Sequence, residues 1–277
     1  SGNAQVLRVL ARTHFFAGRY PEAYDTLKKA VDAGFEDKWE SLALYERTLY
    51  TTAGWTEVKR GSFRVRYKPG VDAILIDEAF DALERSDKFV TPLMGARPPG
   101  ETILEIFPDG RSFIAASSLT KDAVETTGTI ALSKWSRLLL TSPRALGRGY
   151  DWKDTIAHEY IHLVVAHNTN DKAPVWLQEA IAKYLDNRWQ DGKNHFHLDV
   201  RRQGLLARAI AEDDLVTFEE MYPSLAMLPS AERAGLAYAQ LAMLMGYAFE
   251  QGGEGVLLRV LPLVRDGTEP REALAAG

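Results

Sequence analysis

Cysteine is absent from this chain of 277 residues. Its absence excludes disulfide bonds, thiolate metal sites, iron–sulfur clusters and cysteine nucleophiles, so any catalytic or metal site must use other side chains. A surplus of positive charge is also missing, because 33 lysines and arginines stand against 38 aspartates and glutamates and leave a net charge of −5. Nucleic-acid-binding proteins usually carry a clustered basic face, and the charge balance therefore argues against a nucleic-acid partner.

Long apolar runs are missing too. A membrane-spanning helix needs about 20 consecutive apolar residues. The most apolar stretch, residues 236–249, is interrupted by Gln240 and Gly246. We therefore predict no membrane span in this chain. No signal peptide is visible, but Ser1 to Ala4 resemble the remnant of a tag, so this observation leaves the compartment open.

The first part of the chain, residues 1–53, has the spacing of amphipathic helices. Residues 4–37 resemble one tetratricopeptide repeat of 34 residues. The positions that carry this resemblance are Ala11, Gly18, Tyr20, Ala23, Leu27 and Ala30. Phe35 departs from the repeat pattern, which often has proline there. Two ordinary amphipathic helices are the alternative. One and a half repeats bury their own faces poorly, so these helices either end a longer solenoid or pack on the rest of the chain.

Alternating hydrophobicity and turn residues predict strands and helices in the remainder. The predicted strands cover residues 63–67, 102–107, 128–132 and 138–141. A helix is predicted over residues 74–93, and further helices follow residue 143. Strands followed by helices favour an α+β fold, with a sheet lobe over residues 54–150 joined to a helical lobe over residues 151–277.

The strongest chemical signal is the sequence His-Glu-Tyr-Ile-His at positions 158–162. Four residues on a helix correspond to about 40° of rotation and 6 Å of rise, so His158 and His162 leave the same face, with Glu159 beside them. Two neutral imidazoles suit zinc, and a nearby carboxylate can take a proton from a zinc-bound water. The surrounding residues are apolar: Ile156, Ala157, Ile161, Leu163, Val164 and Val165. The helix is therefore buried, and its polar groups need partners such as a metal.

A catalytic zinc ion has three protein ligands and one position open to water. Glu179 is the preferred third ligand, because Pro174 can begin a helix that returns antiparallel and brings this glutamate beside the histidines. A glutamate among apolar residues is otherwise hard to explain. The other candidates are His167, which points to a different side of the helix, Asp186, and the pair His195 and His197.

The motif at 158–162, followed 17 residues later by Glu179 in Pro-Val-Trp-Leu-Gln-Glu-Ala, resembles the gluzincin zinc metallopeptidases. The bacterial peptidase MA-like family, with its P-x-W-L-x-E-G signature, is the most similar. The resemblance covers about residues 55–267 and implies a thermolysin-like catalytic domain over residues 54–277. It also implies that His158, His162 and Glu179 bind Zn²⁺, that Glu159 is the general base, and that the substrate is a peptide or protein. The compartment stays open, with export from a bacterial cell included.

Two residues depart from the family pattern. Ala180 stands where the family usually has glycine. Lys183 stands four residues after Glu179, where thermolysin-like relatives have an aspartate that orients the first histidine. This partner must come from elsewhere, and Asp154, Asp186 and a backbone carbonyl are the candidates.

Two further roles are implied by the resemblance. Several gluzincins use a tyrosine of the C-terminal lobe to stabilise the oxyanion. Tyr238, 59 residues after Glu179, is the candidate here, with a plain core tyrosine as the alternative. An edge strand of the sheet lobe pairs with extended substrate in this clan, and residues 128–132 are the candidate, with an internal strand as the alternative.

Two hypotheses of different class follow. In the first, the protein is a zinc-dependent peptidase in which Glu159 activates water. In the second, it is a scaffold whose tetratricopeptide-like helices hold a protein partner, with a zinc site that is structural or inactive. Lys183 favours the second hypothesis, and access of water to the metal distinguishes the two.

Overall fold

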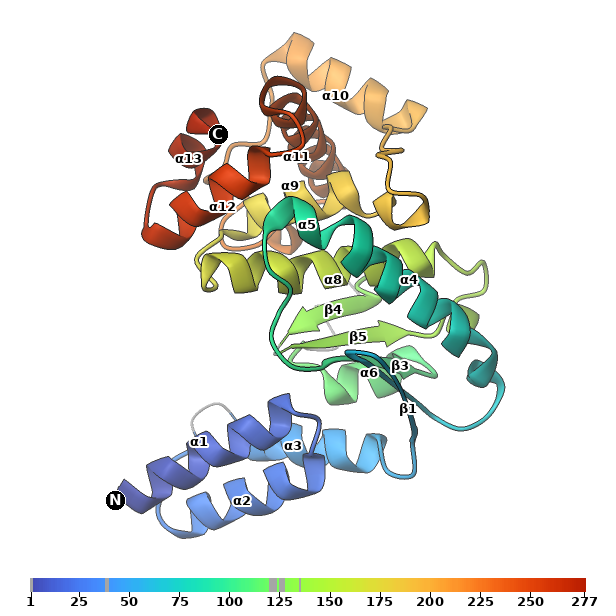
Figure 1. Ribbon diagram of the computed structural model, residues 1–277, viewed down its shortest axis with the longest axis vertical. Helices are drawn as coiled ribbons and strands as arrows, with labels where there is room; N and C mark the ends of the chain where they lie inside the picture. The colour runs from blue at the N-terminus through green and yellow to red at the C-terminus, as the bar shows by residue number, and fades with distance from the viewer. Residues whose placement is uncertain (1, 38–39, 120–123, 125–127, 135) are drawn as a thin grey trace. The chain divides into compact units, whose positions relative to one another are not determined.

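Figure 1 shows the computed structural model, which describes residues 2–37, 40–119, 124, 128–134 and 136–277. The chain forms two compact units. One contains Ser1–Phe80 and Gly100–Trp152, and the other contains Asp81–Pro99 and Lys153–Gly277. The second unit is therefore assembled from two separate stretches of sequence.

The described residues form helices and one five-stranded sheet, which confirms the predicted α+β fold class. The predicted domain limits, 1–53 and 54–277 with lobes meeting after residue 150, stay a prediction. None of the helices in the described ranges has the length and apolar character of a membrane span.

Three helices open the first unit: α1 (Gly2–Phe16), α2 (Tyr20–Asp32) and α3 (Ser41–Thr51). Pro21 lies in the first turn of α2, where its missing N–H costs no hydrogen bond. The ring of Phe15 stacks on that of Tyr45 with centroids 4.1 Å apart, and both side chains are buried. The helices predicted for this part of the chain are present, and their tetratricopeptide-like character stays a prediction.

The sheet of the first unit has the strand order β1-β2-β3-β5-β4. The strands are β1 (Thr56–Arg60), β2 (Phe63–Tyr67), β3 (Thr102–Phe107), β4 (Ala131–Lys134) and β5 (Arg137–Thr141). The three central strands β2, β3 and β5 run parallel, and β1 and β4 pair antiparallel at the two edges. β3 and β5 are buried along their whole length, because the central strands are covered on both faces.

The strands β2, β3 and β5 lie where the sequence predicts them. β4 begins at Ala131 instead of residue 128, and it is an edge strand, as the resemblance implies. β1 was not predicted. It contains Glu57, Lys59 and Arg60 and is at most half-buried, so it lacks the apolar alternation that identifies a strand in sequence.

A buried ionic cluster connects the N-terminal helices to the sheet. Glu105 on β3 accepts hydrogen bonds from Arg137 Nε on β5 at 3.1 Å, from Arg66 Nη1 on β2 at 2.7 Å, and from the Tyr20 hydroxyl on α2. Glu105 and Arg137 are fully buried. Burial alone would raise the pKa of Glu105, but the two guanidinium groups outweigh this effect and lower it. Helix α2 is therefore fixed to the sheet by a charged contact whose acceptor, Glu105, is fully buried.

Short helical segments complete the first unit: η1 (Val71–Leu75), α6 (Gly110–Ala116) and η2 (Pro143–Ala145). Helix α4 (Ile76–Phe89) begins in the first unit and continues into the second, and it forms most of the helix predicted over residues 74–93. The second unit then contains α5 (Thr91–Met94), α8 (Trp152–Thr169), α9 (Val175–Leu185), η3 (Arg188–Gln190), α10 (Val200–Glu212), η4 (Leu225–Met227), α11 (Ala231–Gly252), α12 (Val256–Asp266) and α13 (Pro270–Ala276).

Residues of the stretch Asp81–Pro99 form hydrogen bonds with helix α8. The Tyr160 hydroxyl donates to Asp87 Oδ1 at 2.6 Å. At the end of the helix, Asn168 Oδ1 accepts from the Ala96 N–H at 3.0 Å, and its Nδ2 donates to the Ala96 carbonyl at 2.7 Å. Two residues on a helix correspond to about 200° of rotation, so Tyr160 leaves α8 on the side opposite His158. The back of α8 is thus anchored, and its front presents the histidine pair.

Candidate metal centre

The two histidines of α8 face each other across one turn of the helix. Their Nε2 atoms lie 3.2 Å apart, and the side chains of His158 and His162 are 18% and 14% exposed. Most of the helix around them is buried, as its apolar residues predict. The two imidazole nitrogens therefore converge on one point that solvent can still reach.

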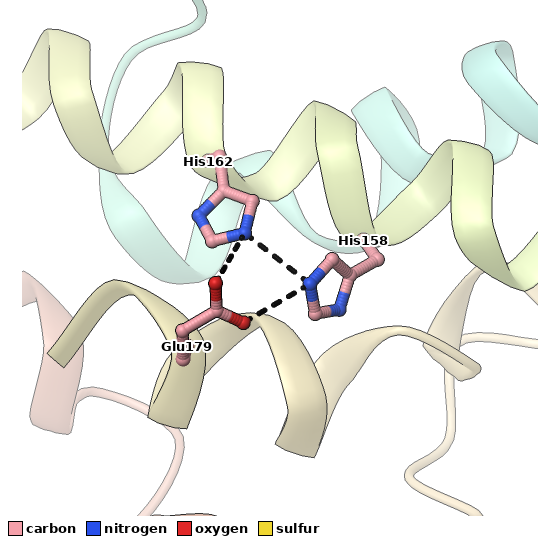
Figure 2. Close-up of side chains that lie close together, drawn as sticks. All are labelled: His158, His162 and Glu179. Atoms are coloured by element: carbon pink, nitrogen blue, oxygen red, sulfur yellow. Dashed lines mark hydrogen bonds and ion pairs between the residues drawn. The ribbon is translucent and has the colours of Figure 1, made fainter. Parts of the chain in front are cut away.

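Glu179 completes the group from the neighbouring helix. Pro174 precedes the first turn of α9, as predicted, and Figure 2 shows the Glu179 carboxylate opposite the histidine pair. Its Oε2 lies 3.3 Å from His158 Nε2, and its Oε1 lies 3.6 Å from His162 Nε2. Within the described ranges, these three residues form the one group of three side chains with ligand atoms close enough to bind a metal, all within 4.8 Å of one another.

The donor set fits Zn²⁺. Two imidazole nitrogens and one carboxylate oxygen are the ligands of a catalytic zinc site with one coordination position open. Glu179 Oε2 is buried and has no well-aligned hydrogen bond, which is costly for a carboxylate oxygen unless a cation faces it. The group therefore has the composition, the convergence and the unsatisfied acceptor that a divalent cation requires.

A carboxylate also lies beside the outward-facing nitrogen of His158. His158 Nδ1 lies 3.8 Å from Asp186 Oδ2, and the same oxygen accepts a hydrogen bond from Lys183 Nζ at 2.7 Å. The other candidate carboxylate, Asp154, instead accepts from the Trp189 indole at 2.7 Å. Of the two carboxylates that the sequence left open for His158, Asp186 is the one that lies beside it.

Gln178 is a polar neighbour of His162, and sequence reasoning missed it. Its side chain raises the pKa of that ring. Gln178 Nε2 donates to the Ala173 carbonyl at 2.9 Å, which holds the amide near the start of α9. The available signal was a polar residue directly before Glu179 on a mostly apolar helix.

The pKa values of the two histidines move apart. Burial lowers the pKa of His158, but the carboxylates of Asp186 and Glu179 outweigh this effect and raise it to about 10. Burial lowers the pKa of His162 to about 4, and the neighbouring His158 contributes to this shift. Burial would raise the pKa of Glu179, but the two histidines lower it. Without a metal, His158 therefore carries a proton at neutral pH, and a divalent cation must displace it.

Tyr238 lies on α11, which packs along α9. Burial raises the pKa of its hydroxyl, and the negative charges of Glu179 and Glu159 raise it further. The hydroxyl is thus within electrostatic reach of both carboxylates and remains protonated over the whole physiological pH range.

The alternative ligands lie outside this group. His195 is exposed and pairs with Asp191 at 2.9 Å, and His197 and His167 are exposed as well. Asp186 contacts the outer nitrogen of His158 and is not one of the three converging groups. The structure therefore brings together the three residues that the motif and the resemblance favoured.

Comparison with known proteins agrees with this geometry. A model of the peptidase MA superfamily matches residues 124–277, which is more than half of the chain and includes α8, α9 and α11. The search of curated proteins found no match. The family match implies a peptidase that acts on peptide substrates, in agreement with the resemblance seen in the sequence. With its paired histidines and its glutamate inside the matched region, the chain belongs to the peptidase MA superfamily.

Proposed function

We propose that this protein is a zinc-dependent peptidase of the gluzincin type, in which His158, His162 and Glu179 bind the metal. The convergence of two Nε2 atoms and one carboxylate within 4.8 Å carries this proposal. When bound, Zn²⁺ supplies a Lewis acid and a water of lowered pKa. The Asp186 carboxylate, 3.8 Å from His158 Nδ1, supports it, because an acidic group beside a ligating histidine helps to orient the ring.

Glu159 is the proposed general base. It follows His158 on α8 and is half-buried beside the metal ligands. A carboxylate in this position accepts a proton from the attacking water and passes it to the leaving nitrogen of the cleaved peptide bond. Tyr238 is the proposed donor to the carbonyl oxygen under attack, since its hydroxyl stays protonated.

The proposed function is tested first by removing the metal. We expect the purified protein to cleave unfolded casein and to contain one zinc ion per chain by elemental analysis. Dialysis against a chelator should abolish cleavage, and added Zn²⁺ should restore it, because the Lewis acid and the water are lost and regained with the metal. Cleavage that survives the loss of all bound metal would refute the zinc mechanism.

The role of Tyr238 gives a second prediction. The substitution Tyr238→Phe removes only the hydroxyl, and we expect kcat to fall about 10²-fold, as for other single oxyanion donors. Zinc content should not change, because Tyr238 is not one of the converging ligands. The measurement is kcat on a quenched fluorescent peptide together with elemental analysis. An unchanged kcat would assign Tyr238 to the core alone.

Lys183 is the residue that favours the alternative function, a scaffold with a structural or inactive zinc site. That lysine occupies the place of the orienting aspartate in the family pattern, but Asp186 lies beside His158 nonetheless. The departure therefore changes which residue supplies the carboxylate, and it leaves the peptidase as the function that the site supports best.

A further inference from the structure

We propose that Lys183 holds Asp186 back from His158 and thereby weakens zinc binding at this site. The proposal rests on the proposed zinc site and concerns the strength with which the metal is held. It assigns a tuning role to the residue that departs most clearly from the family pattern.

The geometry is a competition for one oxygen atom. Asp186 Oδ2 accepts a hydrogen bond from Lys183 Nζ at 2.7 Å, whereas His158 Nδ1 lies 3.8 Å from the same oxygen. The first distance is that of a charge-assisted hydrogen bond, and the second is too long for any hydrogen bond. Lys183 is therefore the closer partner of this oxygen, and its hydrogen bond competes with any contact between Asp186 and His158.

Burial makes this competition effective. The Asp186 side chain is 10% exposed, and water cannot readily replace either donor at its oxygen. The Lys183 side chain is 35% exposed, so it is partly buried as well. A mostly buried ion pair is screened far less than a surface pair, so the lysine charge is felt at the metal ligands.

A weaker outer contact means a weaker metal ligand. A carboxylate that accepts from the outer nitrogen of a ligating histidine raises the basicity of the inner nitrogen and fixes the ring. Lys183 removes part of this effect, since it neutralises the carboxylate and draws it away. Lys183 also stands one helical turn after Glu179 on α9, and a positive charge there opposes a divalent cation at the site.

The test measures zinc affinity at fixed pH by competition with a fluorescent chelator. We expect Lys183→Met to bind Zn²⁺ about tenfold more tightly than the wild type, which is the scale of outer contacts in metal sites. Lys183→Arg keeps the charge and should stay close to the wild type. Lys193→Met is the matched control, because it removes an exposed lysine of the same unit that pairs with no metal ligand or outer partner.

A double substitution separates the contact with Asp186 from the lysine charge alone. We expect Asp186→Asn to weaken zinc binding more in the Lys183→Met background than in the wild type, because only there is the carboxylate free to contact His158. The visible spectrum of the Co²⁺-loaded protein should shift with Lys183→Met, and the unfolding temperature of the metal-free protein should not.

Two results would overturn the inference. One is a Lys183→Met variant that binds zinc no more tightly than the wild type. The other is a loss of zinc affinity on Asp186→Asn that is equal in the wild type and in the Lys183→Met variant, since Lys183 would then act without Asp186. A wild-type protein that binds no zinc would instead overturn the proposed function and this inference together, so the two failures are distinguishable.

Discussion

Replacing Glu159 by glutamine is expected to lower kcat by about 10²- to 10⁴-fold, the usual contribution of a general acid–base group, while zinc stays bound. Glutamine has the same shape but cannot accept the proton of the attacking water. The three proposed metal ligands are untouched, so we expect metal content to stay at one ion per chain. The measurements are kcat on a peptide substrate and zinc by elemental analysis.

The matched control for this experiment is Glu84→Gln. Glu84 is an exposed glutamate on α4 in the same unit, and its substitution removes the same charge at a surface position. We expect it to leave both kcat and zinc content unchanged. Turnover at the wild-type rate by the Glu159→Gln protein would refute its assignment as the base.

Replacing Glu105 by alanine is expected to lower the free energy of unfolding by about 3–5 kcal/mol, the cost of leaving a buried charge without its partner. Arg137 is fully buried, and in the wild type it donates to Glu105. Tyr20 and Arg66 would lose the same acceptor. Urea unfolding followed by circular dichroism measures the loss.

Glu101 provides the control for Glu105. Its carboxylate pairs with Lys59 and Arg64, but its side chain is 39% exposed, so Glu101→Ala should cost at most about 1 kcal/mol. The pKa of Glu105 is lowered in the folded protein, so its contribution is present above the ordinary carboxyl pKa. It is lost as the pH falls through the lowered folded-state value. The loss of unfolding free energy on Glu105→Ala should therefore be large at neutral pH and smaller in acid. Any other result would contradict this role of the cluster.

The geometry of the candidate metal centre was largely predictable because its signals are local. The spacing of His158 and His162 depends only on helix geometry, and Pro174 marks the start of the helix that carries Glu179. The choice between Asp154 and Asp186 was not predictable. It depends on where the Trp189 indole lies, and that side chain takes Asp154.

The fold was predictable to a similar degree. Strands β2, β3 and β5 have apolar patterns that identify them, whereas β1 is half-buried and charged and gives no such signal. The Glu105 cluster could not be read from the sequence. Its guanidinium partners come from strands 39 and 32 residues away, and only the order of strands in the sheet brings them together.

The insertion of Asp81–Pro99 into the second unit has a practical consequence for anyone who trims this protein. A fragment that starts at residue 124, where the family match begins, would keep the three proposed zinc ligands but lose Asp87 and Ala96. Tyr160 and Asn168 would then meet solvent instead of their partners, on the rear surface of the helix that carries both histidines. Low yield or aggregation of such a truncated protein would reflect the loss of these hydrogen bonds. It would say nothing about whether the site hydrolyses peptides.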